Sequence, residues 1–368
     1  MPTVNIRIAG TGRYIPDIVV PNEAFKGLAF YSKENELLQG DNDTLIKEIA
    51  RKTGISSRRH CEPDKVASDI GFIAAKAAIE DAGITPDQLT GILCCSNVGD
   101  VEANGFGRMD NVPSLASRIK EKLETPKPRV YAFDLGGGCA GWLMGVDDAC
   151  SRILAYYTRH KYDKRNPQRI LVIGAETLSR VSDLSDIHSM TYSDGAGAVV
   201  VEAFRSNKRN GIMEPAVKTY AHGCRDSVFL GPSNQYGFQQ EGELFIKTRG
   251  STVMERALQY SPGVIKAAIK SAKLKLKDID IFLFPQTNEK FNWAVAKRLF
   301  DGKRVPKDKF PMILDWLPNP STATHPILLD LLRRGEMEGY EINPGNKVLF
   351  YSLGAGINIA AFVYKVPE

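Results

Sequence analysis

The stretch Phe133-Asp134-Leu135-Gly136-Gly137-Gly138-Cys139-Ala140-Gly141-Trp142 decides how this chain is interpreted. An apolar segment from Arg129 to Leu135 predicts a strand, and Ala140 to Leu154 predicts a helix. The three glycines between them permit a tight turn and close approach of a substrate. Cys139 would stand at a helix N-terminus, where the dipole and free N–H groups favour a thiolate and can act as oxyanion donors. The pattern indicates a nucleophile elbow with sulfur in place of oxygen.

The same stretch allows two other interpretations. A free cysteine is usually a small buried hydrophobic residue, and Cys139 could be one. Its place at a strand-to-helix turn of three glycines favours the functional interpretation. The glycines could also suggest phosphate binding, but neither a GxGxxG pattern nor a Walker lysine accompanies them.

Apolar strands alternate with amphipathic helices along the whole chain, which predicts an α/β protein. Further strands are predicted at residues 6–12, 89–96, 169–175, 196–203, 279–284, 347–353 and 357–363, and helices at 45–52, 68–82, 253–274, 292–299 and 327–335. A polar stretch at 204–211 separates two parts of similar texture. We therefore expect two halves, residues 1–205 with Cys139 and residues 206–368, packed as one body.

Composition excludes several classes of protein. The 368 residues are 43% hydrophobic and 25% charged, and the net charge of +5 is spread over short clusters. No basic-aromatic interleaving or finger spacing supports nucleic-acid binding. The six cysteines and five histidines show no metal spacing. No signal-peptide pattern and no apolar run of about 18 residues is present, so a cytoplasmic protein with reduced thiols and no membrane span is expected.

An ordered set of motifs resembles the β-ketoacyl-acyl-carrier-protein synthase III family of the thiolase superfamily. The motifs are Ile8 to Pro16, Lys52-Thr53-Gly54-Ile55 with Arg58-Arg59, Ala67-Ser68-Asp69, Ala132 to Gly141, Gly174-Ala175-Glu176, Asp194 to Ala198, Glu241-Gly242 with Phe245 and Lys247, Pro318-Asn319 to Pro326, and Gly354-Ala355-Gly356. The set covers nearly the whole chain and is far more specific than any one member.

The resemblance implies a fold and a chemistry. The fold would be the thiolase-like five-layered α-β-α-β-α arrangement of two similar halves, in a homodimer. Cys139 would take an acyl group from a thioester, and Asn319 would hold the carbonyl of an incoming malonyl-type thioester. The N–H groups of Cys139 and the Gly354-Ala355-Gly356 turn would form the oxyanion hole. No cofactor would be bound permanently, because acyl groups would arrive on coenzyme A or on the phosphopantetheine of an acyl carrier protein.

The chain departs from the family at the catalytic histidine. Pro285 occupies that position, and a one-residue slip would put Gln286 there; neither side chain is a general base. Losing one charge-assisted donor would cost decarboxylation roughly 3 kcal/mol, whereas acylation of an intrinsically nucleophilic cysteine needs less help. His325 is a candidate substitute, although packing beside Pro326 at a helix start is the more common role for a histidine in such a place. His188 and His222 are weaker candidates.

A second departure concerns the acyl donor. Members that use coenzyme A stack an aromatic residue on adenine and carry an arginine nearby, but Glu48 and Lys52 stand at these positions. A carboxylate cannot stack and repels phosphate, which favours a carrier-protein donor. Cationic candidates for phosphate or carrier contacts, each of which could instead be solvated surface, are Lys52, Arg58, Arg59, Lys247 and Arg249.

Three functions remain open from the sequence. The first is a condensing enzyme that joins the acyl group on Cys139 to a malonyl- or β-ketoacyl-type thioester in fatty-acid or polyketide-like biosynthesis. The second is an acyltransferase that works without decarboxylation. The third is a degenerate subunit that supports an active paralogue in a heterodimer. The missing histidine favours the second and third, whereas Cys139 and Asn319 favour the first and second.

Overall fold

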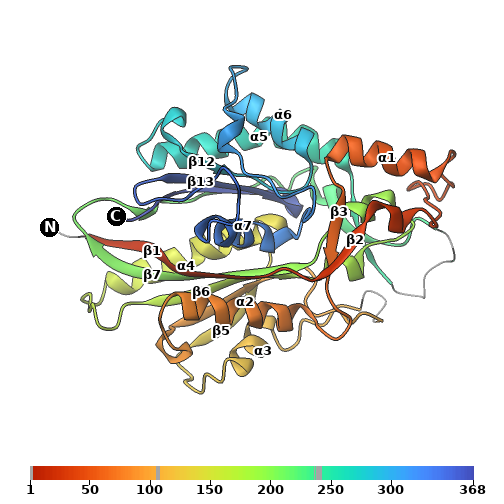
Figure 1. The fold of residues 1–368 in the computed structure, drawn as a ribbon. Coiled ribbons are helices and arrows are strands. Elements are labelled where there is room, and N and C mark those ends of the chain that lie inside the picture. The colour runs from red at the N-terminus through yellow and green to blue at the C-terminus, as the bar shows by residue number, and fades with distance from the viewer. Residues whose placement is uncertain (1–2, 105–107, 236, 238–242) are drawn as a thin grey trace.

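Two five-stranded sheets form the centre of the molecule in a computed structural model that describes residues 3–104, 108–235, 237 and 243–368 (Figure 1). The first sheet has the order β1-β7-β6-β4-β5. Its strands are β1 (Thr3–Tyr14), β7 (Gly195–Ser206), β6 (Arg169–Glu176), β4 (Gly91–Cys95) and β5 (Tyr131–Leu135). β4 pairs in parallel with β5 and β6, whereas β7 pairs antiparallel with β1 and β6.

The second sheet is built from the later part of the chain. Its order is β12-β13-β14-β8, with β9 also paired to β14. The strands are β12 (Ile281–Leu283), β13 (Lys347–Gly354), β14 (Asn358–Lys365), β8 (Gly211–Ile212) and β9 (Ala216–Thr219). The strands of the first sheet lie between residues 3 and 206 and those of the second between 211 and 365. The predicted strands are present in both sheets, with ends shifted by a few residues.

The helices cover both sheets and fill the space between them (Figure 1). α4 (Gly141–Tyr157) and α7 (Thr324–Arg333) lie between the sheets, where one apolar cluster joins Trp142, Ile327 and Phe350. The outer helices are α2 (Ala67–Asp81) and α3 (Leu115–Lys122) on one side and α5 (Gly250–Ser271) and α6 (Glu289–Leu299) on the other. This layering confirms the predicted α-β-α-β-α fold.

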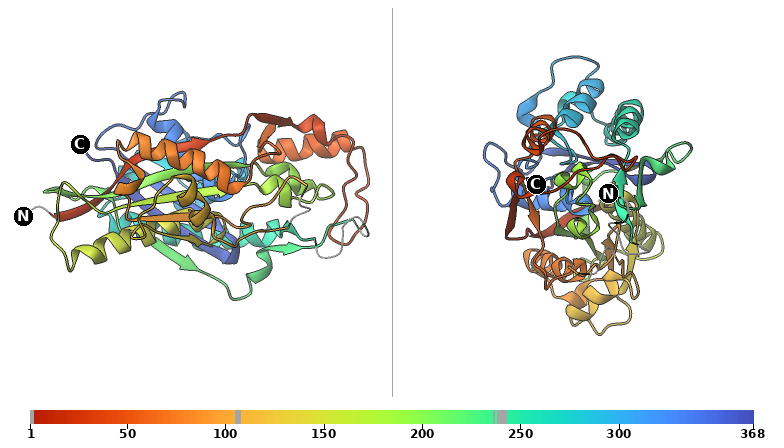
Figure 2. Two further views of the ribbon diagram at one scale, coloured as in Figure 1. Left: turned by 90° about the horizontal axis from the view of Figure 1, so that it is seen from below. Right: turned by 90° about the vertical axis from the view of Figure 1, so that its right-hand side faces the viewer.

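Smaller elements gather at the end of the molecule away from both termini (Figures 1 and 2). They include α1 (Asn42–Thr53), which contacts α6, and the short pair β2 (Ile18–Pro21) and β3 (Ser57–His60). A hairpin joins β10 (Val228–Gly231) to β11 (Phe245–Thr248). The motif residues Glu241 and Gly242 lie outside the described residues.

Glycine determines how closely α2 packs on the first sheet. A Cβ atom on Gly12 of β1 would lie 2.3 Å from the carbonyl oxygen of Ala74, closer than real Cβ contacts allow. The helix follows the predicted apolar spacing and buries Ile70, Ala74 and Ala78 completely. The opening glycine motif is thus explained by helix packing.

Candidate functional site

The Cys139 elbow forms where β5 meets α4. A 3-10 turn, η3 (Gly138–Ala140), carries Cys139, and α4 begins at Gly141. Gly138 has a φ of 62°, and a Cβ atom there would lie 2.2 Å from the backbone nitrogen of Ala355. Only glycine fits both the left-handed backbone and the close approach. The predicted strand–turn–helix is confirmed, with Cys139 in a tighter turn than the α-helix start that the sequence suggested.

The Gly354–Ala355 turn packs directly against this elbow. A Cβ atom on Gly354 would lie 2.5 Å from the backbone nitrogen of Cys139. Ser352 Oγ donates a hydrogen bond of 2.9 Å to the carbonyl oxygen of Cys139, and Asn358 Nδ2 donates one of 2.7 Å to Ala355. Gly356 completes the turn with a φ of 114°. The two segments expected to supply oxyanion donors are therefore adjacent.

Cys139 opens into an apolar pocket of about 510 Å³. Asn319 and Pro285 line this pocket together with Cys139, Gly354 and Ala355. Its apolar wall comes mainly from α1, the β10–β11 hairpin, α5 and α6, through Ile49, Val228, Phe229, Leu230, Ile246, Val253, Met254 and Phe291. The structure therefore offers the thiol a space suited to an acyl chain.

Backbone pairing brings Asn319 to the Pro285 segment. The N–H of Asn319 donates a 2.8 Å hydrogen bond to the carbonyl oxygen of Gln286. The Gln286 side chain is fully buried outside the pocket, and its Oε1 accepts a 2.7 Å hydrogen bond from the N–H of Ile313. Between the two residues that the sequence left open at the histidine position, Pro285 is thus the one on the pocket wall.

The structure does not bring His325 to the thiol. His325 is buried in α7, outside the pocket lining, with its Nε2 2.8 Å from the carbonyl oxygen of Tyr351. Burial lowers its pKa to about 4, which keeps the imidazole neutral. It therefore leaves the candidate site. His188 does line the pocket with an exposed side chain, whereas His222 is exposed and outside the lining.

Two predicted cationic contacts are buried instead. Arg58 is completely buried and donates to the carbonyl oxygens of Met190 and Val20 and to Asn22 Oδ1 at 2.6 Å. Burial lowers the pKa of this guanidinium to about 10. Its guanidinium N–H groups are hydrogen-bonded within the fold, so Arg58 is not available to bind a substrate as the sequence had suggested.

Lys247 is buried for a different reason. Its Nζ contacts the Asp183 carboxylate and donates a 2.8 Å hydrogen bond to Asn234 Oδ1. This ion pair lowers the pKa of Asp183 despite its burial, and it anchors strand β11, which forms one pocket wall. Lys247 is therefore also unavailable to a substrate.

Three predicted cations remain on the surface side of the site. Lys52 lines the pocket, exposed, and pairs with Glu48 at 3.1 Å. Arg249 is exposed, with its guanidinium 5.5 Å from the ring centroid of the pocket residue Phe229. Arg59 is half-buried over Trp316. Lys52 and Arg249 are the two placed beside the pocket.

The Cys139 thiol has a polar neighbour that sequence reasoning missed. The pKa of Cys139 is raised to about 11: burial raises it most, a hydrogen bond from Ser321 lowers it, and the charge of Glu176 raises it. Ser321 Oγ lies 3.1 Å from the sulfur. Burial therefore outweighs the helix-terminus effect that the sequence suggested. Ser321 and Glu176 both fall within motifs quoted above, but no spacing rule linked them to Cys139.

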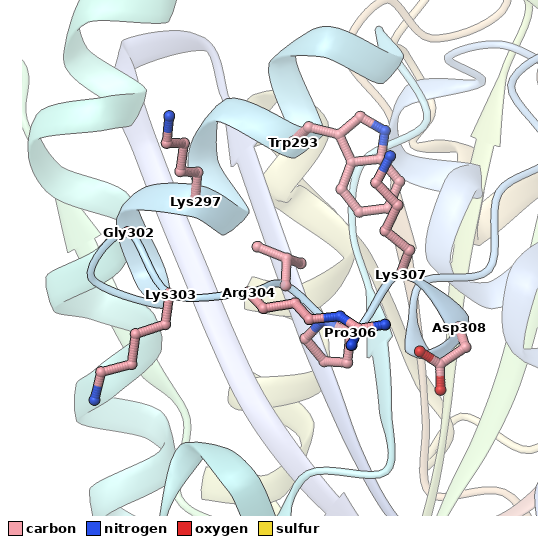
Figure 3. Close-up of a pocket in the computed structure, with 9 residues that line it drawn as sticks. Trp293, Lys297, Gly302, Lys303, Arg304, Pro306, Lys307 and Asp308 are labelled. Carbon is pink, nitrogen blue, oxygen red and sulfur yellow. The ribbon is translucent and has the colours of Figure 1, made fainter.

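A second hollow, of about 810 Å³, lies along α6 and the loop that follows it (Figure 3). Lys297, Lys303, Arg304 and Lys307 line it, and the Lys307 Nζ lies 5.0 Å from the ring centroid of Trp293. None of its lining residues belongs to the Cys139 pocket. It is a basic surface without a nucleophile. Among the described residues, no group of three or more His, Cys, Asp or Glu is arranged to hold a metal.

The layered fold and the cysteine at the end of β5 define a thiolase-like acyl-transferring enzyme. Family models agree: 3-oxoacyl-[acyl-carrier-protein] synthase III matches residues 133–221, and its C-terminal model matches residues 269–366. The chain belongs to the 3-oxoacyl-[acyl-carrier-protein] synthase III family of condensing enzymes, as the motifs predicted. A relative in Cereibacter sphaeroides, named β-ketoacyl-[acyl-carrier-protein] synthase III, is 27% identical over 99% of both chains.

Solved structures show the same fold. A 3-oxoacyl-[acyl-carrier-protein] synthase III from Aquifex aeolicus VF5 aligns with a TM-score of 0.76 at 23% identity, covering 98% of this chain and all of that one. The priming β-ketosynthase of the R1128 polyketide pathway aligns with a TM-score of 0.78 at 24% identity, covering 99% and 96%. No helix in the described part of the chain is long and apolar enough to cross a membrane.

Proposed function

We propose that Cys139 attacks an acyl thioester and carries the acyl group as a covalent thioester inside the apolar pocket. The observation that carries this proposal is the packing of the Gly354–Ala355 turn against the backbone nitrogen of Cys139, in a pocket shared with Asn319. The sulfur would bond to the acyl carbon, the donor C–S bond would break, and the donor thiol would leave with the proton of Cys139. Backbone N–H groups would hold the oxyanion meanwhile.

The acyl group would then pass to a malonyl- or β-ketoacyl-type thioester. Asn319 lines the pocket beside Cys139, and its amide N–H group suits the carbonyl of that second thioester. Donors would be carried on coenzyme A or on the phosphopantetheine of an acyl carrier protein, whose negative charge suits the exposed Lys52 and Arg249. A homodimer stays a prediction from the resemblance, and a cytoplasmic location stays a prediction from the sequence composition.

Pro285 favours a second candidate, acyl transfer without decarboxylation. A proline side chain has no donor for the enolate that decarboxylation creates, and Pro285 lines the pocket that holds Cys139. An acceptor hydroxyl, amine or thiol would need no such donor. The two candidates share the acyl-Cys139 intermediate and differ only in the second step.

One experiment orders these candidates. The purified protein is incubated with acyl-coenzyme A and acyl-carrier-protein donors of several chain lengths and analysed by intact mass, with Cys139→Ala as control. Adduct-loaded enzyme then receives malonyl thioester, and released carbon dioxide is measured. Release together with a β-ketoacyl product supports condensation, and an adduct without release supports simple transfer. No adduct with any donor would leave the supporting-subunit alternative.

A further inference from the structure

We propose that Ser321 donates a hydrogen bond to the Cys139 sulfur and stabilises it as a thiolate, with Asn97 and Glu176 holding Ser321 in this role. The inference rests on the proposed function, because it concerns the nucleophile of that reaction. Ser321 Oγ lies 3.1 Å from Cys139 Sγ. Because it contacts the reacting atom, Ser321 would be a catalytic residue, and Asn97 and Glu176 would be positioning residues.

The backbone of Ser321 is held in an unfavourable conformation. Its φ is 46°, in the left-handed region that serine rarely adopts, and the residue is 2% exposed. Asn319, two residues earlier in the same loop, has a φ of 41°. Such strain persists where the surrounding structure fixes it, and it gathers at functional sites. Here it brings a hydroxyl to the sulfur and an amide into the same pocket.

Asn97 determines the direction of the hydrogen bond. Its Nδ2 lies 2.8 Å from Ser321 Oγ and 2.6 Å from Glu176 Oε1. An amide nitrogen only donates, so the Ser321 oxygen accepts from Asn97 and keeps its own hydrogen for an acceptor. The sulfur lies 3.1 Å away, and the competing acceptor is the Glu176 carboxyl, whose pKa a hydrogen bond from Ser321 also lowers. Once Cys139 ionises, the bond to its thiolate is charge-assisted.

Glu176 fixes the orientation of Asn97. The carboxyl group is completely buried at the end of β6 and accepts hydrogen bonds from the Asn97 backbone N–H at 3.2 Å and from Thr322 Oγ1 at 3.0 Å. Burial raises the pKa of Glu176, and hydrogen bonds, those from Asn97 and Thr322 among them, offset part of this effect and leave it at about 7. Above this pKa, in the range where Cys139 ionises, the carboxylate is charged, so it rejects the Asn97 oxygen and accepts its NH₂ group. Three distant segments of the chain thus converge on one thiol.

The hydrogen bonds that link Glu176, Asn97 and Ser321 give the Cys139 sulfur a hydrogen-bond donor, which Pro285 cannot provide. Among the described residues that line the pocket, the only histidine is His188, whose side chain is exposed. Pro285 has no hydrogen-bond donor. The titratable side chains whose charges act on the sulfur are Glu176 and Tyr192, and the negative form of either disfavours a thiolate. A directed hydroxyl opposes this effect without adding a general base.

The test measures thiol ionisation without any acyl donor. Alkylation of Cys139 by iodoacetamide is followed by peptide mass from about pH 7 to pH 11. Ser321→Ala should alkylate roughly 10- to 100-fold more slowly below the thiol pKa and shift the pH profile upwards, because a hydrogen bond to a charged group is lost. Ser321→Gly, which accepts the positive φ, gives the same answer if the alanine variant does not fold. Ser182→Ala removes a buried hydroxyl that bonds to Leu178 instead, and it should leave the profile unchanged.

Asn97→Ala should shift the profile in the same direction by less, because Ser321 then loses its orientation but keeps its hydroxyl. An unchanged profile in a folded Ser321→Gly variant would overturn the proposal. A shift in Ser321→Gly without one in Asn97→Ala would overturn the positioning role of Asn97 and Glu176. A wild type that alkylates but forms no acyl adduct would refute the proposed function alone, so the two failures are distinguishable.

Discussion

Two of the walls that enclose the Cys139 pocket are built on different principles. Backbone builds one wall, where Gly138 and Gly354 let two chain segments approach within distances that a side chain would block. Side chains build the other wall, from Pro285, Asn319 and Ser321. The backbone wall follows the family motifs throughout, whereas the side-chain wall departs from them at Pro285. The backbone that would bind the oxyanion is thus separate from the side chains that would act in the second step, transfer of the acyl group to its acceptor.

The largest expected effect comes from breaking the backbone wall. Gly138→Ala would place a Cβ atom against the Ala355 nitrogen at a φ of 62°. We expect acyl-adduct formation to slow by about 10²- to 10³-fold, as when an oxyanion donor is lost. Gly136→Ala is the matched control, because a Cβ atom there meets nothing within 4 Å. Equal rates in the two variants would show that the Gly138–Ala355 contact does not support acylation.

Restoring an imidazole tests the side-chain wall. Pro285→His would place a charge-assisted donor on the pocket wall beside Asn319. We expect carbon dioxide release from malonyl thioester by acyl-loaded enzyme to rise roughly 10²-fold. Pro285→Ala controls for loss of the ring and should stay near the wild-type rate. A Pro285→His variant that loads normally but releases carbon dioxide no faster would show that the missing donor does not limit the second step.

The smallest expected effect concerns the pocket surroundings. Arg249→Ala removes an exposed cation beside Phe229, and it should raise KM for an anionic acyl donor by about 2- to 5-fold at low salt. Arg304→Ala makes the same charge change at the second hollow and should have less effect (Figure 3). If Arg304→Ala raised KM more than Arg249→Ala does, the acyl donor would bind at the second hollow and not beside Phe229.

The α/β alternation and the nucleophile elbow could be predicted because local sequence patterns encode them, whereas the five-layered arrangement was predicted from the resemblance to the family. Alternating apolar strands and helices require only short-range periodicity, and three glycines before Cys139 require only a local turn. Residues whose roles depend on distant partners were misread. Arg58 and Lys247 look like surface cations, but Asn22 and Asp183 bury them. Periodicity likewise gave no sign that His325 turns to Tyr351 in the core.

Ser321 shows why the rest of the site could not be predicted. Its contacts reach Cys139 across 182 positions of sequence and Asn97 across 224. Its positive φ also follows no residue preference that a single sequence displays, because serine rarely adopts it. Such contacts become visible only once the sheets place β4, β5 and the loop before α7 together.

The most direct test is the intact mass of the protein after incubation with an acyl thioester. Wild type should gain the mass of one acyl group, the gain should map to Cys139, and Cys139→Ala should gain none. A wild type that stays unmodified with every coenzyme A and carrier-protein donor, or an adduct that persists in Cys139→Ala, would contradict the assignment of Cys139 as the acyl-carrying nucleophile.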